Sequence, residues 1–440
     1  MKRNILPLAA LLAALLLTGC AMRTVEEMYS LPKRSEAYSY LQSAIDMAMA
    51  GLEYAAPVSG ENQQTVQMAD LDGDGVDEYL VFAKGTSENP LQILIFSQDA
   101  EGKCQIREVI QSKGSAFEQV EYVDVDDSPG CEIIVGRQVS DEVLRSVSVY
   151  TFAKGDTKLL MTAGYSKFLT CDLNDDGKSE LMVIQPGEAE AHRGTAVLYG
   201  FRDGMMERSV EAELSEKAEN IKRITVGKLQ SGESAVYVAS AVDESTILTD
   251  IYALKNGRFT NISLSSESGT SVQTLRNYYV YADDVDGDGV LELPSLMTMK
   301  AVSQSWDREK QYLIRWYALD IRGEETDKLY SFHNYAGGWY IQLDGAWANR
   351  VTVDQVGNTY AFYVWDADYG KAAALFTVYA LTGSDRETQT QEDSRFPLYR
   401  SEGVIYAARL ETAAEEYGMT QDTLINCFRL IHQEWKTGET

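Results

Sequence analysis

The chain has 440 residues, of which 67 are Asp or Glu and 39 are Lys or Arg, so its formal net charge at pH 7 is −28. This charge, without any run of Lys and Arg, excludes nucleic-acid binding, which requires basic groups to neutralise phosphates. It also argues against docking of the protein surface on anionic lipid. Five cysteines are too few for a disulfide framework in a chain of this length. One disulfide bond stays open among four scattered residues, Cys104, Cys131, Cys171 and Cys427.

The first residues read as an export signal. Residues 1–3 are Met-Lys-Arg, residues 5–17 are predominantly apolar, and residues 17–20 are Leu-Thr-Gly-Cys. This order predicts a secretory signal peptide over residues 1–19. The Leu-Thr-Gly-Cys ending resembles a bacterial lipobox, which implies cleavage before Cys20 and attachment of fatty-acyl groups such as palmitate to this residue. An uncleaved transmembrane anchor is the alternative, but the apolar run is shorter than the roughly 20 residues that a spanning helix needs. The sequence therefore predicts a lipoprotein on the cell membrane that faces outside the cytoplasm.

A tether and one helix are expected next. Residues 20–34 read as a lipid-anchored tether that ends near Pro32. From Ser35 a helix is predicted, because four apolar side chains follow at helical spacing, namely Tyr38, Leu41, Ile45 and Met49. This helix and its lead-in to the next element occupy residues 35–61.

An acidic loop then occupies residues 70–78, with the sequence Asp-Leu-Asp-Gly-Asp-Gly-Val-Asp-Glu. Side-chain oxygens fall at loop positions 1, 3, 5 and 9, and glycine at position 6 permits a sharp turn. Calcium takes about six to eight oxygen ligands and accepts a backbone carbonyl, which position 7 would supply. The same pattern recurs at residues 172–180 and 284–292. A backbone carbonyl alone is expected as the ligand from Val76, Lys178 and Val290.

We therefore predict up to three structural Ca²⁺ sites. Their ligands are Asp70, Asp72, Asp74, Val76 and Glu78 in the first loop; Asp172, Asn174, Asp176, Lys178 and Glu180 in the middle loop; and Asp284, Asp286, Asp288, Val290 and Glu292 in the last loop. The middle loop carries one formal charge fewer and should bind calcium more weakly, because Asn174 replaces an aspartate.

Two degenerate copies complete the pattern. Residues 124–132 keep Asp124, Asp126 and Glu132, but Pro129 replaces the turn glycine, so we expect no metal site there. Residues 227–235 have lost the carboxylates at the ligand positions. The five loops begin at residues 70, 124, 172, 227 and 284, a period of roughly 50 residues that indicates a repeat architecture.

Strands, and not helices, are expected on both sides of each loop. Apolar β-rich runs follow the loops, as at residues 80–82, 133–135 and 182–184, and similar runs precede them at Val120–Val123 and Tyr278–Tyr281. These strand–loop–strand units resemble the FG-GAP/VCBS repeat family, the calcium-loop repeats of integrin α-chain-like β-propellers, over roughly residues 62–300. The resemblance implies a propeller whose role is adhesion or recognition.

Each interval holds about four strand-like runs, which predicts an all-β fold, a β-propeller of four-stranded blades over residues 62–411. A stacked linear array is the alternative. We expect six blades, with Trp339–Asp344 as the sixth inner strand, or seven if residues 396–411 belong to a further unit. Residues 412–440 form a C-terminal segment with a helix from about Thr420. The apolar stripe of that helix is Leu424, Phe428, Ile431 and Trp435.

The sequence contains no recognisable catalytic motif. The three histidines, His192, His333 and His432, lack metal-ligand spacing, and no nucleophile elbow or phosphate-binding loop occurs. We therefore expect a non-enzymatic protein that binds a protein or glycan ligand. The alternative is a hydrolase or lyase acting on polysaccharide, with two carboxylates roughly 5–10 Å apart at the propeller mouth.

All six tryptophans lie after residue 300. They are expected chiefly to fill blade interfaces and helix contacts. Trp347, which follows a turn at Asp344-Gly345, is the exception that we single out as a candidate for stacking on a sugar ring.

Overall fold

The computed structural model describes residues 36–99, 103–126, 128–139, 145–153, 156–187, 193–278, 280–302 and 311–431. These residues form two compact units. One contains the described parts of 1–56, 64–70 and 75–113, and the other contains 57–63, 71–74 and the described parts of 114–440. Several predictions fall outside the described residues, namely those on the signal peptide, Cys20, the tether, His192, Trp306, His432 and Trp435.

The first unit is one antiparallel sheet with a helix packed against it. The predicted helix is confirmed as α3 (Glu36–Ala48), and Leu41 and Ile45 on it are buried against Val81 and Phe96. The strands are β1 (Glu53–Tyr54), β2 (Val66–Ala69), β3 (Glu78–Lys84), β4 (Leu91–Gln98) and β5 (Cys104–Ser112). Both β1 and β2 pair with β3 along the same edge.

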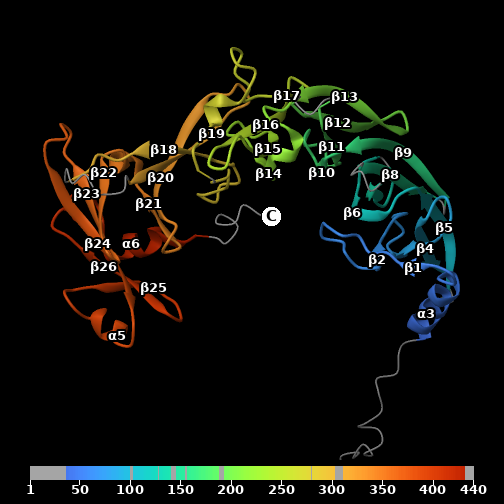
Figure 1. The fold of residues 1–440 in the computed structure, drawn as a ribbon, viewed down its shortest axis with the longest axis horizontal. Coiled ribbons are helices and arrows are strands. Elements are labelled where there is room, and N and C mark those ends of the chain that lie inside the picture. Colours follow the sequence, from blue (N-terminus) through green and yellow to red (C-terminus); the bar gives the residue numbers. More distant parts are fainter. Residues whose placement is uncertain are drawn as a thin grey trace, which may run out of the picture. The chain divides into compact units, whose positions relative to one another are not determined.

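Three four-stranded sheets open the second unit (Figure 1). The first of these contains β6 (Ala116–Val123), β7 (Glu132–Gln138), β8 (Arg145–Ala153) and β9 (Asp156–Tyr165). The next contains β10 (Lys167–Cys171), β11 (Glu180–Gln185), β12 (Thr195–Arg202) and β13 (Met205–Glu213). The third contains β14 (Ile221–Lys228), β15 (Ser234–Ala241), β16 (Ile247–Lys255) and β17 (Arg258–Asn261). In each sheet the strands are antiparallel neighbours in chain order.

The second strand of each of these three sheets is predominantly apolar and is buried on both faces. The side chains of β11 from Glu180 to Ile184, for example, are all buried. A sheet with two apolar faces must pack against neighbours on both sides, as a propeller blade does. The clusters of buried side chains accordingly draw residues from consecutive sheets, as where Ile134 of β7 and Val183 of β11 belong to one cluster.

Two five-stranded sheets follow. One contains β18 (Leu293–Thr298), β19 (Tyr312–Leu319), β20 (Glu325–Asn334), β21 (Trp339–Leu343) and β27 (Phe428–Leu430). The other contains β22 (Val351–Val356), β23 (Thr359–Trp365), β24 (Ala372–Thr382), β26 (Val404–Leu410) and β25 (Phe396–Arg400). Short helical turns connect the strands: η1 (Ala218–Asn220), η2 (Val272–Thr274), α4 (Gly345–Ala348) and α5 (Arg386–Gln389).

The predicted fold class is confirmed, since antiparallel sheets of about four sequential strands are the blades of a β-propeller. The described residues contain six sheets, and β25 and β26 belong to the sixth, so residues 396–411 make no further blade. The prediction for Trp339–Asp344 was wrong. This segment contains β21, the fourth strand of the fifth sheet, because it pairs with β20 and not with β22.

The run before the last acidic loop also differs from the prediction. Tyr278, Val280 and Tyr281 lie outside the strands of the described chain. An isolated bridge between Asp283 and Glu292 takes the place of a longer pairing there.

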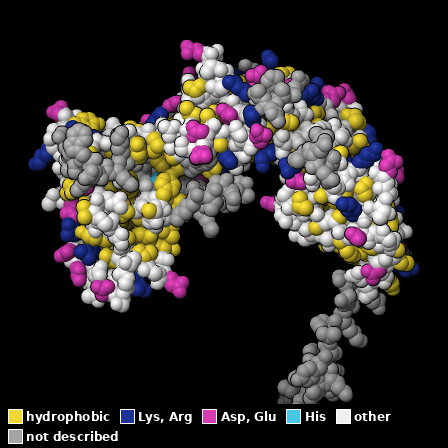
Figure 2. Space-filling view, in the orientation of Figure 1, with side chains coloured by type: hydrophobic (Ala, Val, Ile, Leu, Met, Phe, Trp, Pro, Cys, Tyr) yellow, Lys and Arg dark blue, Asp and Glu magenta, His cyan; other side chains and the backbone are white. Residues whose placement is uncertain are grey.

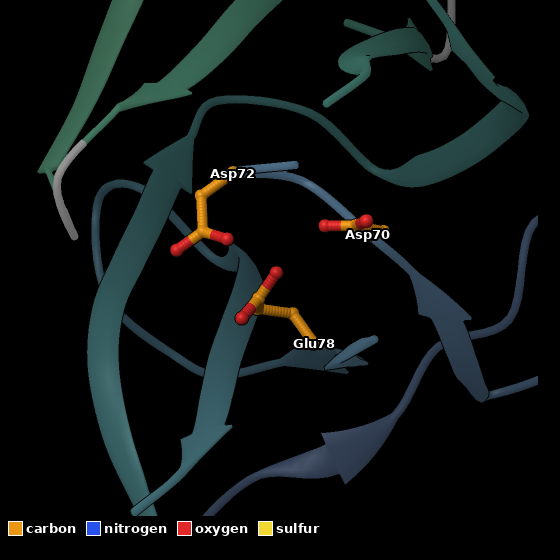
Figure 3. Close-up of side chains that lie close together, drawn as sticks. All are labelled: Asp70, Asp72 and Glu78. Carbon is orange, nitrogen blue, oxygen red and sulfur yellow. The ribbon is translucent and has the colours of Figure 1, made fainter. Parts of the chain in front are cut away.

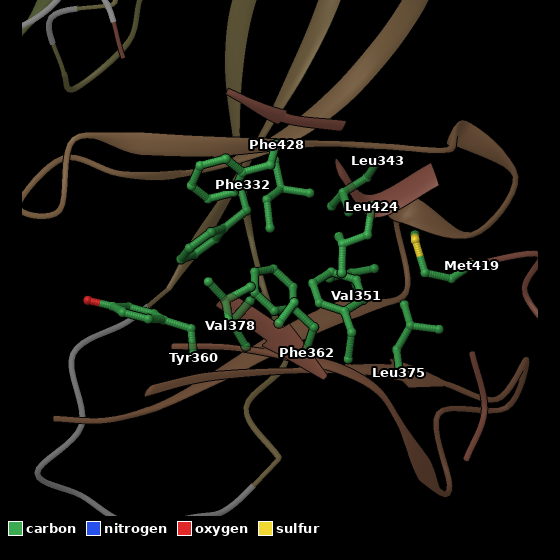
Figure 4. Packing of buried hydrophobic residues seen from close by; sticks show 14 of the residues in the cluster. Phe332, Leu343, Val351, Tyr360, Phe362, Leu375, Val378, Met419, Leu424 and Phe428 are labelled. Atoms are coloured by element: carbon green, nitrogen blue, oxygen red, sulfur yellow. The ribbon is translucent and has the colours of Figure 1, made fainter. Parts of the chain in front are cut away.

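The largest apolar core joins the last two sheets (Figure 4). Phe332 packs edge-to-face on Phe362, with ring centroids 5.3 Å apart, and Phe362 stacks on Phe376 at 4.4 Å. Among the described tryptophans, Trp316, Trp339, Trp347 and Trp365 are all buried. The prediction that tryptophans fill interior contacts is therefore confirmed for these four.

The C-terminal helix begins as predicted but is short. Helix α6 (Gln421–Cys427) starts after Thr420, whose hydroxyl accepts a hydrogen bond from the Thr423 amide. The predicted helical stripe ends at Leu424, because Phe428 starts strand β27, which pairs with β21. None of the helices in the described part of the chain has the length and apolar character needed to cross a membrane.

Candidate metal centre

The acidic loops occupy equivalent places in the sheets. Residues 70–78 join β2 to β3, residues 124–132 join β6 to β7, and residues 172–180 join β10 to β11. The degenerate loop 227–235 joins β14 to β15 in the same way. The prediction that each loop connects two strands is confirmed for these four, and residues 284–292 lead into β18.

Each full loop is curled by the same backbone hydrogen bonds. The carboxylate at position 1 accepts a hydrogen bond from the amide at position 6, at 3.0 Å for Asp70, 2.8 Å for Asp172 and 2.9 Å for Asp284. Position 6 is glycine in all three, and its φ angle is positive, as at Gly75 (85°). Glycine adopts this conformation without the strain that a Cβ atom causes.

Position 4 also requires a residue that tolerates a positive φ angle, and the spacing of the ligands alone did not reveal this. Gly73, Asp175 and Gly287 have φ angles of 72°, 59° and 82°. Glycine and aspartate are among the residues that tolerate this region. The Gly-or-Asp choice at position 4 was therefore a readable signal that the metal-ligand pattern did not use.

In the first loop, carboxylate oxygens converge as predicted (Figure 3). One oxygen from each of Asp70, Asp72 and Glu78 lies within 4.8 Å of the others. Glu78 is buried and accepts a hydrogen bond of 3.1 Å from the Ser97 hydroxyl. Oxygen ligands gathered in this way are the donors that a hard cation prefers.

The last loop has the same convergence and one further feature. Oxygens of Asp284, Asp286 and Glu292 lie within 4.8 Å of one another. Glu292 is fully buried, and its Oε2 accepts a hydrogen bond of 3.0 Å from the Val285 amide. Its Oε1 has no hydrogen-bond partner among the described residues. A buried carboxylate oxygen without a partner is costly, so this oxygen fits a bound cation.

Burial also changes the acidity of the glutamates at position 9. It raises the pKa of Glu292 to about 7, and Asp286 and Asp288 add to this effect. Burial likewise raises the pKa of Glu132 to about 7 and that of Glu180 above its usual value. These shifts reflect negative groups held together in partly desolvated loops, which a positive ion would relieve.

The middle loop brings its side chains together around an amide. The Asn174 Nδ2 donates to Asp176 Oδ2 at 3.0 Å and to Glu180 Oε1 at 2.6 Å. The amide nitrogen therefore bridges the two carboxylates, and it would have to give way to an oxygen before a cation could bind there. That this loop binds calcium more weakly stays a prediction.

The second loop (residues 124–132), for which we expected no metal site, nevertheless brings its carboxylates together. Oxygens of Asp124, Asp126 and Glu132 lie within 4.8 Å of one another, although Pro129 replaces the turn glycine. The turn is made one residue later by Gly130, whose φ angle is 95°. Three acidic clusters among the described residues could thus hold a metal ion: those of the first, second and last loops.

Two position-5 carboxylates stay outside these clusters. Neither Asp74 nor Asp288 belongs to the sets of oxygens that lie within 4.8 Å. Asp288 is instead paired with Lys328, whose Nζ donates to Asp288 Oδ2 at 2.5 Å. Burial opposes the charge on Lys328, but Asp288, Asp286 and Glu292 together hold its pKa above the usual value. The roles of Val76, Lys178 and Val290 as carbonyl ligands stay predictions.

Because Lys328 supplies a positive charge beside the last loop, it competes with a metal ion. We expect Lys328→Met to strengthen calcium binding by this loop by about tenfold, since unit charges 4 Å apart near a protein surface interact by about 4 kcal/mol before losses. Calorimetric titration with calcium measures the change. Lys371→Met, at an exposed lysine, is the control. Weaker binding by Lys328→Met would mean that the lysine holds the loop in its binding conformation.

The second loop (residues 124–132) contacts residues 71–74 on one side and the middle loop (residues 172–180) on the other. A Cβ atom on Gly130 would lie 2.4 Å from the carbonyl oxygen of Leu71 and 2.8 Å from the amide nitrogen of Gly73, so the second loop fits closely against residues 71–74. The second loop (residues 124–132) also contacts the middle loop (residues 172–180), because the Ser179 amide donates to the Asp124 carbonyl at 2.8 Å.

The contacts continue along the second unit. Lys228 Nζ donates to Asp175 Oδ1 at 2.5 Å, joining the degenerate loop to the middle loop. The Leu291 amide donates to the Lys228 carbonyl at 3.0 Å, which joins the degenerate loop to the last one. Residues 71–74 and the four later loops therefore form a continuous row of contacts, in which the loop 227–235, without carboxylates at the ligand positions, serves as a connector.

Trp347 is not available for stacking on a sugar ring. The prediction was wrong because this side chain is only 5% exposed. It lies on α4 and packs edge-to-face against Tyr417, with ring centroids 6.0 Å apart. The nearby Asp344-Gly345 turn caps α4 through a hydrogen bond of 2.7 Å from the Ala346 amide to Asp344 Oδ1, and this cap turns the indole inward.

Two titratable groups outside the loops, His333 and Asp250, lie in the protein interior. Burial lowers the pKa of His333 to about 3, so its ring stays neutral at physiological pH. The buried Asp250 carboxylate accepts hydrogen bonds from the hydroxyls of Ser215 and Ser271, both at 2.6 Å, and from the Asn261 amide at 2.9 Å. Among the described residues, no group of three His, Cys, Asp or Glu side chains converges outside the acidic loops. The described cysteines, Cys104, Cys131, Cys171 and Cys427, form no disulfide bond.

Comparisons with known proteins give only distant similarities. No protein-family model matches the chain, and no curated protein is significantly similar to it. Among solved structures, exotype rhamnogalacturonan lyase YesX is 11% identical, with a TM-score of 0.28, over 82% of this chain and 72% of that one. Saccharomyces cerevisiae Sqt1 is 11% identical, with a TM-score of 0.31, over 71% and 87%. Rhamnogalacturonan lyase YesW is 10% identical, with a TM-score of 0.29, over 72% and 71%. Similarity of this extent carries no argument about function.

Proposed function

We propose that the protein is a calcium-stabilised, lipid-anchored β-propeller that binds a protein or glycan ligand outside the cytoplasm and catalyses no reaction. The observation that supports it best is the last acidic loop. There the buried Oε1 of Glu292 has no hydrogen-bond partner among the described residues and lies with Asp284 and Asp286. Three carboxylates that converge beside a buried oxygen without a hydrogen-bond partner among the described residues are suited to a cation.

Calcium is the ion that best fits the donor set. The loops offer carboxylate, amide and carbonyl oxygens and contain no histidine or cysteine at the ligand positions. Hard oxygen ligands suit calcium, whose coordination geometry is flexible, better than zinc or copper. Extracellular calcium modules bind with dissociation constants of about 10⁻⁴–10⁻³ M, so calcium levels outside a cell can fill them.

The ligand-binding role is proposed from the architecture of the loops and sheets. Loops held rigid at the ends of a stable scaffold are suited to recognition. Figure 2 shows acidic and basic side chains interspersed over the face that is drawn.

The membrane anchor is proposed from the Leu-Thr-Gly-Cys sequence at residues 17–20. We expect Cys20→Ser to abolish incorporation of radiolabelled palmitate and to move the protein from the membrane fraction to the soluble fraction. Cys104→Ser is the matched control and should keep both the label and the membrane location. Labelled, membrane-bound Cys20→Ser would contradict the assignment.

The binding role is tested by capture of partners from the cell envelope with and without calcium. We expect the wild-type protein to retain a specific protein or glycan when calcium is present and to lose it in excess chelator. Turnover of a panel of polysaccharides by the purified protein would overturn the non-enzymatic assignment.

A further inference from the structure

A cavity lies where the first strands of three consecutive sheets meet in the second unit. Residues of β6, β10 and β14 line a space of about 570 Å³. A second space of about 620 Å³ adjoins it and shares Arg145, Tyr165, Ser166, Lys167 and Ile221 with it. Volumes of this order are typical of sites for small molecules and short oligomers. No carboxylate of the acidic loops lines either space.

The cavity has the opposite charge balance to the chain. Its lining contains four basic residues, Arg145, Lys167, Lys222 and Arg223, and three acidic ones, Glu118, Glu121 and Glu219. The whole chain has 39 basic and 67 acidic residues. A local excess of positive charge inside a strongly acidic protein attracts an anionic group to this one place.

Two of the four basic side chains, Lys167 and Lys222, form no ion pair with another described residue. Arg145 is paired with Glu118 at 3.2 Å and also donates to the Ser166 carbonyl at 3.3 Å. Lys167 and Lys222, in contrast, are exposed and have no ion pair or side-chain hydrogen bond with any other described residue. Their ammonium groups lie on β10 and β14, on neighbouring sheets, and are therefore placed to contact two separate anionic groups of one ligand.

The wall behind these lysines is rigid. Tyr165 and Phe168 pack edge-to-face with ring centroids 5.0 Å apart. Gly136 lies directly behind them, because a Cβ atom there would come within 2.6 Å of the Tyr165 hydroxyl and 2.7 Å of Phe168. A wall without room for movement pre-organises the polar groups in front of it, which lowers the entropy cost of binding.

Acceptors and donors alternate along the rest of the lining. The Thr170 hydroxyl donates to Glu121 Oε2 at 2.5 Å, and Gln119 Nε2 donates to Glu121 Oε1 at 2.5 Å. The carboxylates of Glu118 and Glu121 thus lie among the cations and can accept further hydrogen bonds. A ligand with many hydroxyl groups and a few carboxylates satisfies both kinds of group.

An added peptide strand is a poorer fit here. The edge of β6 is already covered by residues 57–63, since the amides of Val58 and Ser59 donate to the carbonyls of Phe117 and Glu118 at 3.2 and 2.8 Å. A peptide therefore cannot extend this sheet at β6 through main-chain hydrogen bonds.

We propose that this cavity binds an acidic oligosaccharide. Carboxylates on two of its sugar rings pair with Lys167 and Lys222, and its hydroxyl groups donate to Glu118 and Glu121. This inference rests on the proposed ligand-binding function and names the ligand class.

The test is calorimetric titration of the purified full-length protein with a galacturonic acid tetrasaccharide, at fixed calcium and again in excess chelator. Wild type should bind the acidic probe and not a neutral galactose tetrasaccharide, and added salt should weaken binding. The double variant Lys167→Met/Lys222→Met should bind the acidic probe about tenfold more weakly or worse. Lys371→Met, at an exposed lysine remote in sequence, should bind like wild type. Thermal melts verify that the variants are folded.

Each alternative result overturns the inference. The proposed site is contradicted if wild type does not bind the acidic probe, or if the double variant binds it with unchanged affinity. Binding of a poly-glutamate peptide that is lost in the double variant, without binding of the sugar, assigns the cavity to acidic proteins. None of these results affects the calcium dependence of unfolding or the palmitate label, so failure here and failure of the proposed function are distinguishable.

Discussion

Calcium is expected to raise the midpoint temperature of unfolding, and chelation is expected to lower it. A ligand that binds only the native state stabilises it by about 2.7 kcal/mol per site when its free concentration is 100 times the dissociation constant. For sites of the extracellular class this condition is met at about 10 mM calcium or above. Differential scanning calorimetry with added calcium or excess chelator measures the effect. Identical melts under both conditions would contradict the metal assignment.

Glu292→Gln provides a sharper form of this test. In chelator the substitution should leave stability unchanged or raise it, because it removes a buried negative charge whose Oε1 has no hydrogen-bond partner among the described residues. In calcium the same substitution should lower stability relative to wild type, because a charged ligand is lost. Asp156→Asn, at an exposed aspartate at the start of β9, is the control and should change neither melt. A variant that is less stable in both conditions would assign Glu292 a purely structural role.

Gly130→Ala is expected to destabilise the protein strongly. Gly130 has a φ angle of 95°, which costs a residue with a Cβ atom about 1–3 kcal/mol. The new methyl group would also lie 2.4 Å from the Leu71 carbonyl oxygen and 2.8 Å from the Gly73 amide nitrogen, so the second loop has to move away from residues 71–74. We expect a total loss of at least about 2 kcal/mol in the free energy of unfolding. Chemical denaturation measures it.

Gly232→Ala separates backbone strain from the loss of this contact. Gly232 has a φ angle of 99°, and nothing lies within 4 Å of the position of its Cβ atom. It therefore has the backbone conformation of Gly130 without the close neighbours. Gly130→Ala should therefore lower the free energy of unfolding by more than Gly232→Ala does. Equal losses would show that the contact between the second loop and residues 71–74 contributes nothing.

The sequence was informative where function depends on spacing within one loop. Asp70, Asp72 and Glu78 converge because nine residues with a glycine at position 6 can only curl in a few ways, and those ways are readable from residue types. The apolar runs after the loops likewise identified the buried second strands, as in β11. Local chemistry of this kind does not depend on the rest of the chain.

The failures mostly involve contacts with distant residues. Pro129 excluded a turn at its own position, but Gly130 makes the turn one residue later, where it fits against residues 71–74. β21 was assigned to the wrong sheet because its partner strand, β20, is not encoded in its own residues. Two further residues were misassigned for the same reason. Trp347 is buried against Tyr417, and Phe428 pairs with β21, so distant residues decide what each of them does. Lys328 carries no signal in sequence that it would pair with Asp288, 40 positions away.

Strand β27 has a consequence for how the polypeptide reaches its final state. It adds to the outer edge of β21 more than 80 residues after that strand, with Phe428 stacked on Trp339 at a centroid distance of 5.6 Å. The fifth sheet therefore stays incomplete until the segment that follows α6 has been synthesised, and Trp339 lacks one of its covering rings until then. Closure of this sheet has to wait for a strand that is distant in sequence, so its fifth position is filled after the sixth sheet has already been synthesised.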